Sequence, residues 1–300
     1  MSRYLNPYTD FGFKKLFGEE ANKDLLMDFL NQLLPPKHQI ADLQFKNPEN
    51  LPDLPLERKA IFDIYCKSTT GEDFIVEMQK AKLNFFKDRA LFYSTYPIRD
   101  QAKKGEWDFK LSAIYYVAIL DFRYDEQEEK QKFLREVSLK DQDGDLFYDK
   151  LHFSFLQMPL FNKQEHELKT RSDKWLFFLK NLEAFDYIPA ILKEPIFEKA
   201  FSTLEEANLT KEQLEQYQKS LLSYWELKGV VDTAHNEGKV EGKVEGLIEG
   251  EQIGLEKGII EGRIKGKLEV ALKLKQEGFS IEMIEKITGL SVEEINQLVD

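Results

Sequence analysis

Two acids and a glutamine on neighbouring strand-like runs are the residues best suited to chemistry. Asp63 lies in the run KAIFDIYCK, and Glu77 and Gln79 lie in the run DFIVEMQK. The five residues between the runs, STTGE, include a glycine, which predicts a hairpin turn. Side chains alternate along a strand, so Glu77 and Gln79 share a face. A turn centred near Thr70 would put Asp63 opposite Glu77, at the distance of about 5 Å typical of cross-strand neighbours.

Facing acids with apolar flanks predict a cation, because two such carboxylates repel each other strongly when nothing neutralises them. Metal-dependent cleavage of phosphodiesters needs carboxylates that hold Mg²⁺ and a polar or basic group near the attacking water. The alternative is a half-exposed sheet on which all three side chains face solvent, with Arg58 or Lys80 as ion-pair partners. Spacing alone leaves both interpretations open.

The surrounding pattern predicts a mixed α/β core that positions this hairpin. A helical run is expected at 11–34, where Pro35 and Pro36 end it. The nearly continuous apolar run at 111–122 predicts a strand buried on both faces. The other expected elements are strands at 40–45, 59–67 and 73–80, an amphipathic helix at 84–104 with a break at Pro97, strands within 133–159, and helices within 163–227.

Glycines then recur in strict four-residue steps, at 238, 242, 246, 250, 254, 258, 262 and 266. Each glycine costs about 1 kcal/mol inside a helix relative to alanine, so the row needs packing to offset it. A row of this kind permits close approach between helix backbones. The pattern predicts either a self-association stalk or a weakly ordered linker.

Residues 278–300 predict two short helices. Ser280 and Ser291 are suitable N-caps, Glu294 completes a capping box with Ser291, and Gly289 occupies the C-cap position between the helices. The arrangement is similar to a helix-turn-helix that could read DNA. However, residues 281–300 carry five acids and one lysine. We therefore favour packing against protein.

Composition limits the function classes. The net charge of −12 argues against indiscriminate coating of nucleic acid. Residues 58–104 nevertheless carry ten Lys and Arg against six Asp and Glu, so the region around the hairpin is locally basic. The single cysteine, Cys66, excludes an internal disulfide, and the four histidines lack ligand spacing. No signal peptide or membrane span is expected, which predicts a cytoplasmic protein.

Four blocks of the chain, in order, resemble a known family. NPYTDFGFKKLFG at 6–18 is similar to its opening block, and Asp63 followed by VEMQ at 76–79 resembles its catalytic hairpin. Further blocks resemble its helix and central strand, with Arg89, Tyr93, Ser94 and Gln101 followed by 115–122. The glycine-stepped tail is also typical of it. On these residues the chain resembles the bacterial Rpn family of recombination-promoting, transposase-like nucleases, within the PD-(D/E)XK superfamily.

The resemblance implies a metal site made by Asp63, Glu77 and the carbonyl of Met78, with Mg²⁺ or Mn²⁺ as cofactor. Gln79 stands where the superfamily usually has lysine, and an amide can orient water or phosphate but carries no charge. Lys80 and Lys82 are nearby, but strand alternation places both on the opposite face unless a bulge intervenes.

Four further residues are possible accessories of that site. Asp10 could add an acid or serve as the N-cap of the helix at 11–34, and we favour the cap. Arg89 lies in a matching block. Tyr93 and Gln101 could face DNA, although packing and hydrogen bonding on the helix are simpler roles.

The sequence thus predicts three parts: a PD-(D/E)XK-like nuclease domain at 1–225, a helical stalk at 226–277 and an end module at 278–300. The expected activity is metal-dependent endonuclease cleavage of DNA, linked by the resemblance to recombination or defence against mobile DNA. The expected partners are DNA and further copies of the chain through the glycine row. The competing hypothesis is a non-catalytic, self-associating DNA- or protein-binding module.

Overall fold

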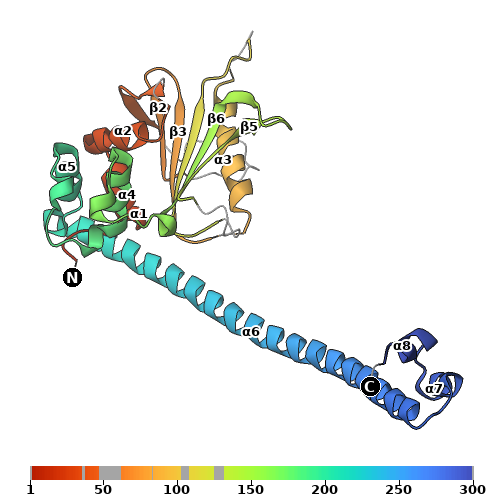
Figure 1. Ribbon diagram of the computed structural model, residues 1–300. Coiled ribbons are helices and arrows are strands. Elements are labelled where there is room, and N and C mark those ends of the chain that lie inside the picture. The colour runs from red at the N-terminus through yellow and green to blue at the C-terminus, as the bar shows by residue number, and fades with distance from the viewer. Residues whose placement is uncertain are drawn as a thin grey trace, which may run out of the picture. The chain divides into compact units, whose positions relative to one another are not determined.

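The computed structural model describes residues 2–35, 38–46, 62–82, 84–102, 108–124 and 132–298 (Figure 1). The chain divides into two compact units, Met1–Val231 and Asp232–Asp300. The expected division into three parts remains a prediction. No helix among the described residues is both long enough and apolar enough to cross a membrane.

A mixed sheet organises the first unit, as the sequence predicts. Its strand order is β1-β2-β3-β4-β6-β5. The pairs β1–β2, β2–β3 and β5–β6 are antiparallel, whereas β3–β4 and β4–β6 are parallel. Every residue of the central strand β4 is buried, which confirms the strand buried on both faces. The strands are β1 (Leu43–Lys46), β2 (Ile64–Ser68), β3 (Asp73–Gln79), β4 (Ile114–Leu120), β5 (Leu134–Lys140) and β6 (Leu146–Gln157).

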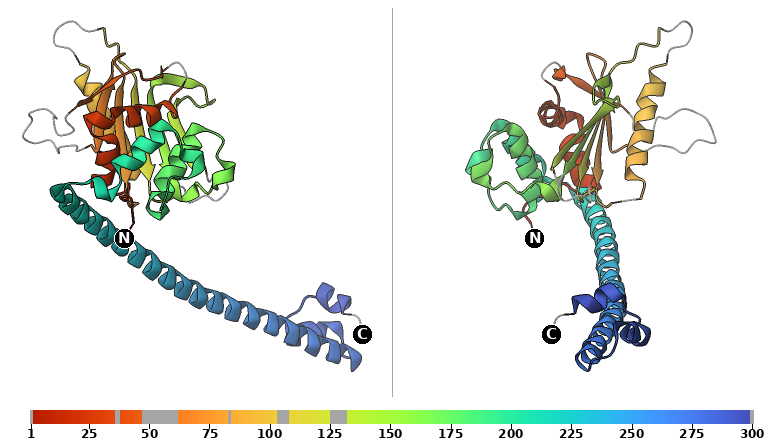
Figure 2. Two further views of the ribbon diagram at one scale, coloured as in Figure 1. Left: turned by 90° about the vertical axis from the view of Figure 1, so that its left-hand side faces the viewer. Right: turned by 45° about the vertical axis from the view of Figure 1, so that its right-hand side comes forward.

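Helices cover both faces of the sheet (Figure 1; Figure 2, right). On one face lie α1 (Asp10–Phe17), α2 (Lys23–Asn31), α4 (Arg171–Asn181) and α5 (Pro195–Thr203). Trp175 lies at the centre of this layer, fully buried against Phe17, Phe29, Phe178 and Phe197 at ring-centroid distances of 4.9–5.9 Å. The opposite face is covered by α3 (Phe86–Asp100), which packs on alternate residues such as Ile75 and Tyr116. Burial on both faces makes the sheet a rigid platform for side chains at its strand ends.

The hairpin of β2 and β3 is present with the expected register. Ile64 pairs with Val76, so the ladder extended by one residue sets Asp63 opposite Glu77. Gly71 adopts a positive φ of 104°, and its N–H donates to the hydroxyl of Ser68 at 3.1 Å. The start of the expected strand at 59–67 and the proposed ion-pair partner Arg58 lie outside the described residues.

The expected single helix at 11–34 is wrong. Two helices, α1 and α2, occupy this stretch and are separated at Gly18–Asn22. A side chain at Gly18 would bring its Cβ within 2.9 Å of the Lys14 carbonyl oxygen. The Asn22 side chain donates to the Lys15 carbonyl at 2.9 Å, which takes an acceptor that a continuing helix would use. Side-chain competition for the backbone therefore breaks the helix.

Two smaller expectations are also wrong. Asp10 is not the N-cap, because the Thr9 side chain accepts the Gly12 N–H and Asp10 is the first helical residue. Pro97 does not break α3, which continues to Asp100. A proline removes one helical hydrogen bond. Pro97 is buried, and its packing offsets this loss in the last turns of α3. A turn at 143–144 joins β5 and β6, with Gly144 at φ 89°.

The second unit contains most of α6 (Lys211–Gln276), followed by α7 (Ile281–Thr288) and α8 (Val292–Gln297). The glycine row is helical throughout, and a Cβ built on any of its glycines would meet nothing within 4 Å. Ser280 and Ser291 are the N-caps, Ser291 forms the capping box with Glu294, and Gly289 is the C-cap at φ 66°. The cap pattern in the sequence therefore predicted both short helices correctly.

Candidate active site

Two hydrogen bonds cross the hairpin beside Asp63 and Glu77, and one of them joins these two residues. The Asp63 N–H donates to Glu77 Oε1 at 3.3 Å, and the Met78 N–H donates to Asp63 Oδ2 at 2.7 Å. Asp63 directly precedes β2 and Glu77 lies within β3. The strand register thus brings the two acids together at one end of the hairpin.

Glu77 is only 1% exposed, and burial is the main cause of its raised pKa. The nearby charge of Asp63 raises the pKa of Glu77 further, while Arg89 opposes this effect. Burial also raises the pKa of Asp63, and the charge of Asp10 adds to it. Both acids therefore lack the solvation that carboxylates ordinarily have, and a bound cation would supply the missing compensation.

Gln79 shares the α3-facing side of β3 with Glu77 and is 7% exposed. Its amide Nε2 donates to Glu77 Oε2 at 2.9 Å. One of the two amide hydrogens is thus used to hold the Glu77 carboxylate in place. Gln79 is neutral, so it orients Glu77 without cancelling its charge.

Arg89 reaches the same carboxylate from α3, the helix that covers this face of the sheet. Its Nη2 lies 3.6 Å from Glu77 Oε2, and the guanidinium lies 4.9 Å from the centre of the Tyr93 ring. Tyr93 in turn contacts Phe62 edge-on at 5.2 Å. The structure therefore places Arg89 with Asp63, Glu77 and Gln79, and Tyr93 behind Arg89 as packing.

Two hollows open beside Asp63, and Asp63 and Asp10 line both of them. The larger has a volume of about 590 Å³, and its basic lining residues are Lys14, Lys15 and Lys46. The smaller has a volume of about 220 Å³ and is lined also by Gln79, Lys80 and Arg89. The alternation argument therefore fails for Lys80, because β3 ends at Gln79 and the alternating geometry ends with it.

Asp10 lies near Asp63 but is more exposed. It forms an ion pair with Lys14 at 3.0 Å, and 53% of its side chain is accessible. Its charge is close enough to raise the pKa of Asp63. Asp10 is thus placed at the mouth of the candidate site, beside the paired acids.

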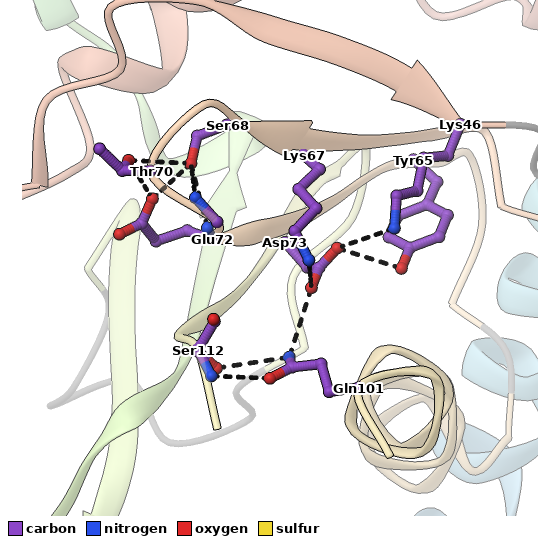
Figure 3. A network of polar contacts seen from close by, with 10 residues as sticks. Lys46, Tyr65, Lys67, Ser68, Thr70, Glu72, Asp73, Gln101 and Ser112 are labelled. Atoms are coloured by element: carbon purple, nitrogen blue, oxygen red, sulfur yellow. Dashed lines mark hydrogen bonds and ion pairs between the residues drawn. The ribbon is translucent and has the colours of Figure 1, made fainter. Parts of the chain in front are cut away.

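Gln101 lies in a different cluster, centred on Asp73 (Figure 3). Its Nε2 is 3.3 Å from Asp73 Oδ2, and its Oε1 accepts the Ser112 N–H at 2.6 Å. Asp73 is 1% exposed and also lies 3.2 Å from the Tyr65 hydroxyl and 3.5 Å from the amino groups of Lys46 and Lys67. Gln101 therefore ties the end of α3 to the sheet, away from Asp63 and Glu77.

Sequence reasoning missed two acids that make side-chain contacts at the ends of strands. Asp73 shares the face of Glu77 four residues earlier on β3, a parity signal that could have identified it. Asp121 follows β4, and its N–H donates to the Gln79 carbonyl at 2.9 Å. Its carboxylate accepts the Tyr224 hydroxyl at 2.9 Å, which links the start of α6 to the end of the sheet. No local pattern relates Asp121 to a residue 103 positions later.

The donor set fits a hard divalent cation. Among the described residues, no group of three or more His, Cys, Asp or Glu side chains is placed to hold a metal. The candidate ligands are the two carboxylates and a backbone carbonyl, all oxygen donors. Mg²⁺ is commonly held by one or two carboxylates and keeps several waters. Two desolvated acids with one arginine nearby also leave negative charge for such an ion to neutralise.

A mixed sheet layered between helices, with paired acids on a hairpin, defines the class of PD-(D/E)XK nuclease folds. The model of the PD-(D/E)XK nuclease family transposases matches residues 7–234, and the chain belongs to that family. The match includes the hairpin, α3 and the start of α6, and it ends before Gly238, the first glycine of the row. No curated protein and no solved structure matches the chain.

The raised pKa of Glu77 predicts how the metal-free protein responds to pH. A carboxyl group whose pKa is higher in the folded than in the unfolded chain contributes stability below the unfolded pKa, and this is lost as pH rises through the folded pKa. In EDTA, we expect the melting temperature to fall as the pH rises from the ordinary carboxylate pKa through the raised pKa of Glu77 in the folded protein. Mg²⁺ should reduce the fall.

Thermal melts of Glu77→Gln across the same pH series measure this contribution. The variant should lose most of the slope, whereas Glu198→Gln, at an exposed position on α5, should keep it. A wild-type slope in Glu77→Gln would show that the pH dependence arises elsewhere.

Proposed function

We propose that this protein is a metal-dependent endonuclease that hydrolyses phosphodiester bonds of DNA. Asp63 and Glu77 hold Mg²⁺ or Mn²⁺, and the Met78 carbonyl is a third ligand. The observation that carries the proposal is the facing pair of acids, Glu77 buried and Asp63 half-buried, beside two hollows that lysine and arginine side chains help to line. Family membership adds a nuclease-like function. A role in recombination or in defence against mobile DNA is a further part of the proposal.

The protein's own residues hold and orient the reacting groups. The bound cation would supply Lewis-acid polarisation of the phosphate and lower the pKa of an attacking water. Asp63 is fixed by the Met78 N–H, and Glu77 is fixed by Gln79 and by the Asp63 N–H. The second amide hydrogen and the side-chain oxygen Oε1 of Gln79 would orient water or phosphate, because neither has a hydrogen-bond partner among the described residues.

DNA is the proposed partner of the two hollows. Their basic lining residues, Lys14, Lys15 and Lys46 in one and Lys80 and Arg89 in the other, are suited to phosphates that flank Asp63. Single lysine and arginine side chains can contact phosphates even in an acidic protein, since nearby charges dominate the field at a site. Asp10 and Asp63 also line both hollows, and the bound cation would offset their charge.

The test is a plasmid-nicking assay with purified full-length protein in Mg²⁺, in Mn²⁺ and in EDTA. Relaxed or linear plasmid should appear with a divalent metal and not in EDTA. Absence of cleavage in both metals, with binding of DNA retained, would support the competing non-catalytic binding module and contradict the proposal.

Gln79 provides a separate prediction. Gln79→Ala should lower the cleavage rate by roughly 10- to 100-fold, because the amide that orients water or phosphate is lost while both metal ligands remain. Gln79→Lys should be tolerated or improve cleavage, because it restores the charge usual in the superfamily. Calorimetric titration with Mg²⁺ is the second measurement. Complete loss of metal binding by Gln79→Ala would instead make Gln79 a structural support of the metal site.

We also propose that the glycine row of α6 associates with the same row in another copy of the chain. All eight glycines are open on the helix surface, and the row carries exposed apolar side chains such as Val240, Leu247 and Ile248. An isolated helix with this composition is marginal, so a partner surface is needed to stabilise it. A second copy offers the same close approach from both sides.

A further inference from the structure

Arg89 combines features that the proposed roles of Asp63, Glu77 and Gln79 do not explain. It lies in the first turns of α3, and Phe86 and Ala90 on either side of it are buried in the layer under that helix. Its own side chain is 35% exposed. The helix therefore anchors Arg89 beside Glu77 while part of its side chain remains accessible.

The contact between Arg89 and Glu77 is an attraction without a hydrogen bond. Nη2 lies 3.6 Å from Glu77 Oε2, which is beyond hydrogen-bond distance. Arg89 Nε is buried and has no hydrogen-bond partner among the described residues. A buried donor left unpaired is unfavourable and rare in folded proteins. The Arg89 guanidinium thus keeps one buried N–H, on Nε, that no described residue accepts.

The hollow beside Arg89 needs a positive group if it is to take a phosphate. Asp63, Gln79, Lys80 and Arg89 all line it, and its volume is about 220 Å³. Gln79 is neutral and directs an amide hydrogen to Glu77. Lysine is a flexible point charge, whereas arginine presents a planar fork that matches two phosphate oxygens. Stacking on Tyr93 further orients the guanidinium.

We propose that Arg89 is a catalytic residue that binds the non-bridging oxygens of the scissile phosphate and supplies the positive charge that Gln79 lacks. The inference rests on the proposed nuclease function and adds a group to its machinery. It also implies that the scissile phosphate binds in the smaller hollow.

The step that Arg89 assists is hydrolysis. A water oxygen bonds to phosphorus, one bridging P–O bond breaks, a proton from the water passes to solvent, and the departing oxygen takes up a proton. Negative charge on the non-bridging oxygens is concentrated during this step, and a preorganised cation stabilises it. Arg89 stays protonated throughout, because a guanidinium does not deprotonate in proteins.

The geometry also predicts how metal binding responds to substitution. Arg89 is a positive charge beside Glu77, so it opposes the entry of a second cation. Arg89→Met removes that charge and keeps a long apolar side chain against Tyr93. The variant should therefore bind Mg²⁺ at least as tightly as the wild type while it loses cleavage, a combination that general disruption of the site would not produce.

The experiment compares Arg89→Met and Arg89→Lys with Arg99→Met. Arg99 is the matched control, because it lies on the same helix with its guanidinium 5.1 Å from the Tyr96 ring but does not line the hollow. The measurements are the cleavage rate at saturating DNA, Mg²⁺ binding by calorimetry, DNA binding by anisotropy in Ca²⁺, and thermal melts. Arg89→Met should lose about 100-fold or more in rate. Arg89→Lys should regain part of it, and Arg99→Met should stay within about twofold, as expected for a surface site.

The outcomes separate the two proposals. If the wild-type protein cleaves DNA and Arg89→Met cleaves it equally fast, the proposed role of Arg89 is overturned and the nuclease function is not. Loss of Mg²⁺ binding by Arg89→Met would overturn it too, because Arg89 would then act by maintaining the metal site. Wild-type protein that cleaves nothing in Mg²⁺ or Mn²⁺ would overturn the nuclease function and the catalytic role of Arg89 with it.

Discussion

Asp63→Ala and Glu77→Ala are each expected to abolish metal-dependent cleavage of DNA. Loss of either proposed ligand would remove the charge stabilisation that a bound metal supplies, which is worth several kcal/mol, so the rate should fall by at least about 1000-fold. Conversion of supercoiled plasmid over time measures the rate. The neutral variants Asp63→Asn and Glu77→Gln should be equally inactive, because each keeps the shape of the side chain and removes its charge.

Asp73→Asn is the matched control. Asp73 is a buried acid on the same face of β3, yet its partners are Tyr65, Lys46, Lys67 and Gln101 (Figure 3). Its substitution should lower the melting temperature and leave metal-dependent cleavage in place. Undiminished cleavage by either Asp63→Ala or Glu77→Ala would remove both residues from the metal site.

Replacing Gly246, Gly250 and Gly254 together with leucine is expected to convert oligomers into single chains. Leucine raises intrinsic helicity, yet its side chain prevents the close backbone approach that glycine permits. Sedimentation velocity measures the assembly, and the circular dichroism spectrum and melting temperature report whether the nuclease unit stays folded. The α6 helix is continuous through these positions, so the substitutions need not disturb its path.

The triple alanine variant separates helicity from steric blocking. Alanine also gains about 1 kcal/mol of helix propensity per site but adds only a methyl group. It should retain more association than the leucine variant. Oligomers that persist unchanged in the leucine variant, or after deletion of all residues beyond 228, would make the glycine row a linker.

The sequence by itself was sufficient for the hairpin, because its determinants are local. Alternating residues define the faces of β2 and β3, the glycine at 71 permits the turn, and the length of that turn places Asp63 opposite Glu77. The buried strand β4 and the capped helices α7 and α8 follow from equally short patterns. In each case the determinants, the spacing of apolar residues and the hydrogen bonds of the helix caps, involve only a few neighbouring residues.

The tertiary structure decided how groups distant in sequence meet. The contact of Arg89 with Glu77 depends on the packing of α3 against the sheet, and that of Tyr224 with Asp121 on where α6 begins. The break between α1 and α2 depends on Asn22 taking the Lys15 carbonyl, which periodicity does not reveal. Periodicity specifies which face of an element is apolar. The partner of that face, and the polar groups that meet at its edge, are set by close packing of the whole core.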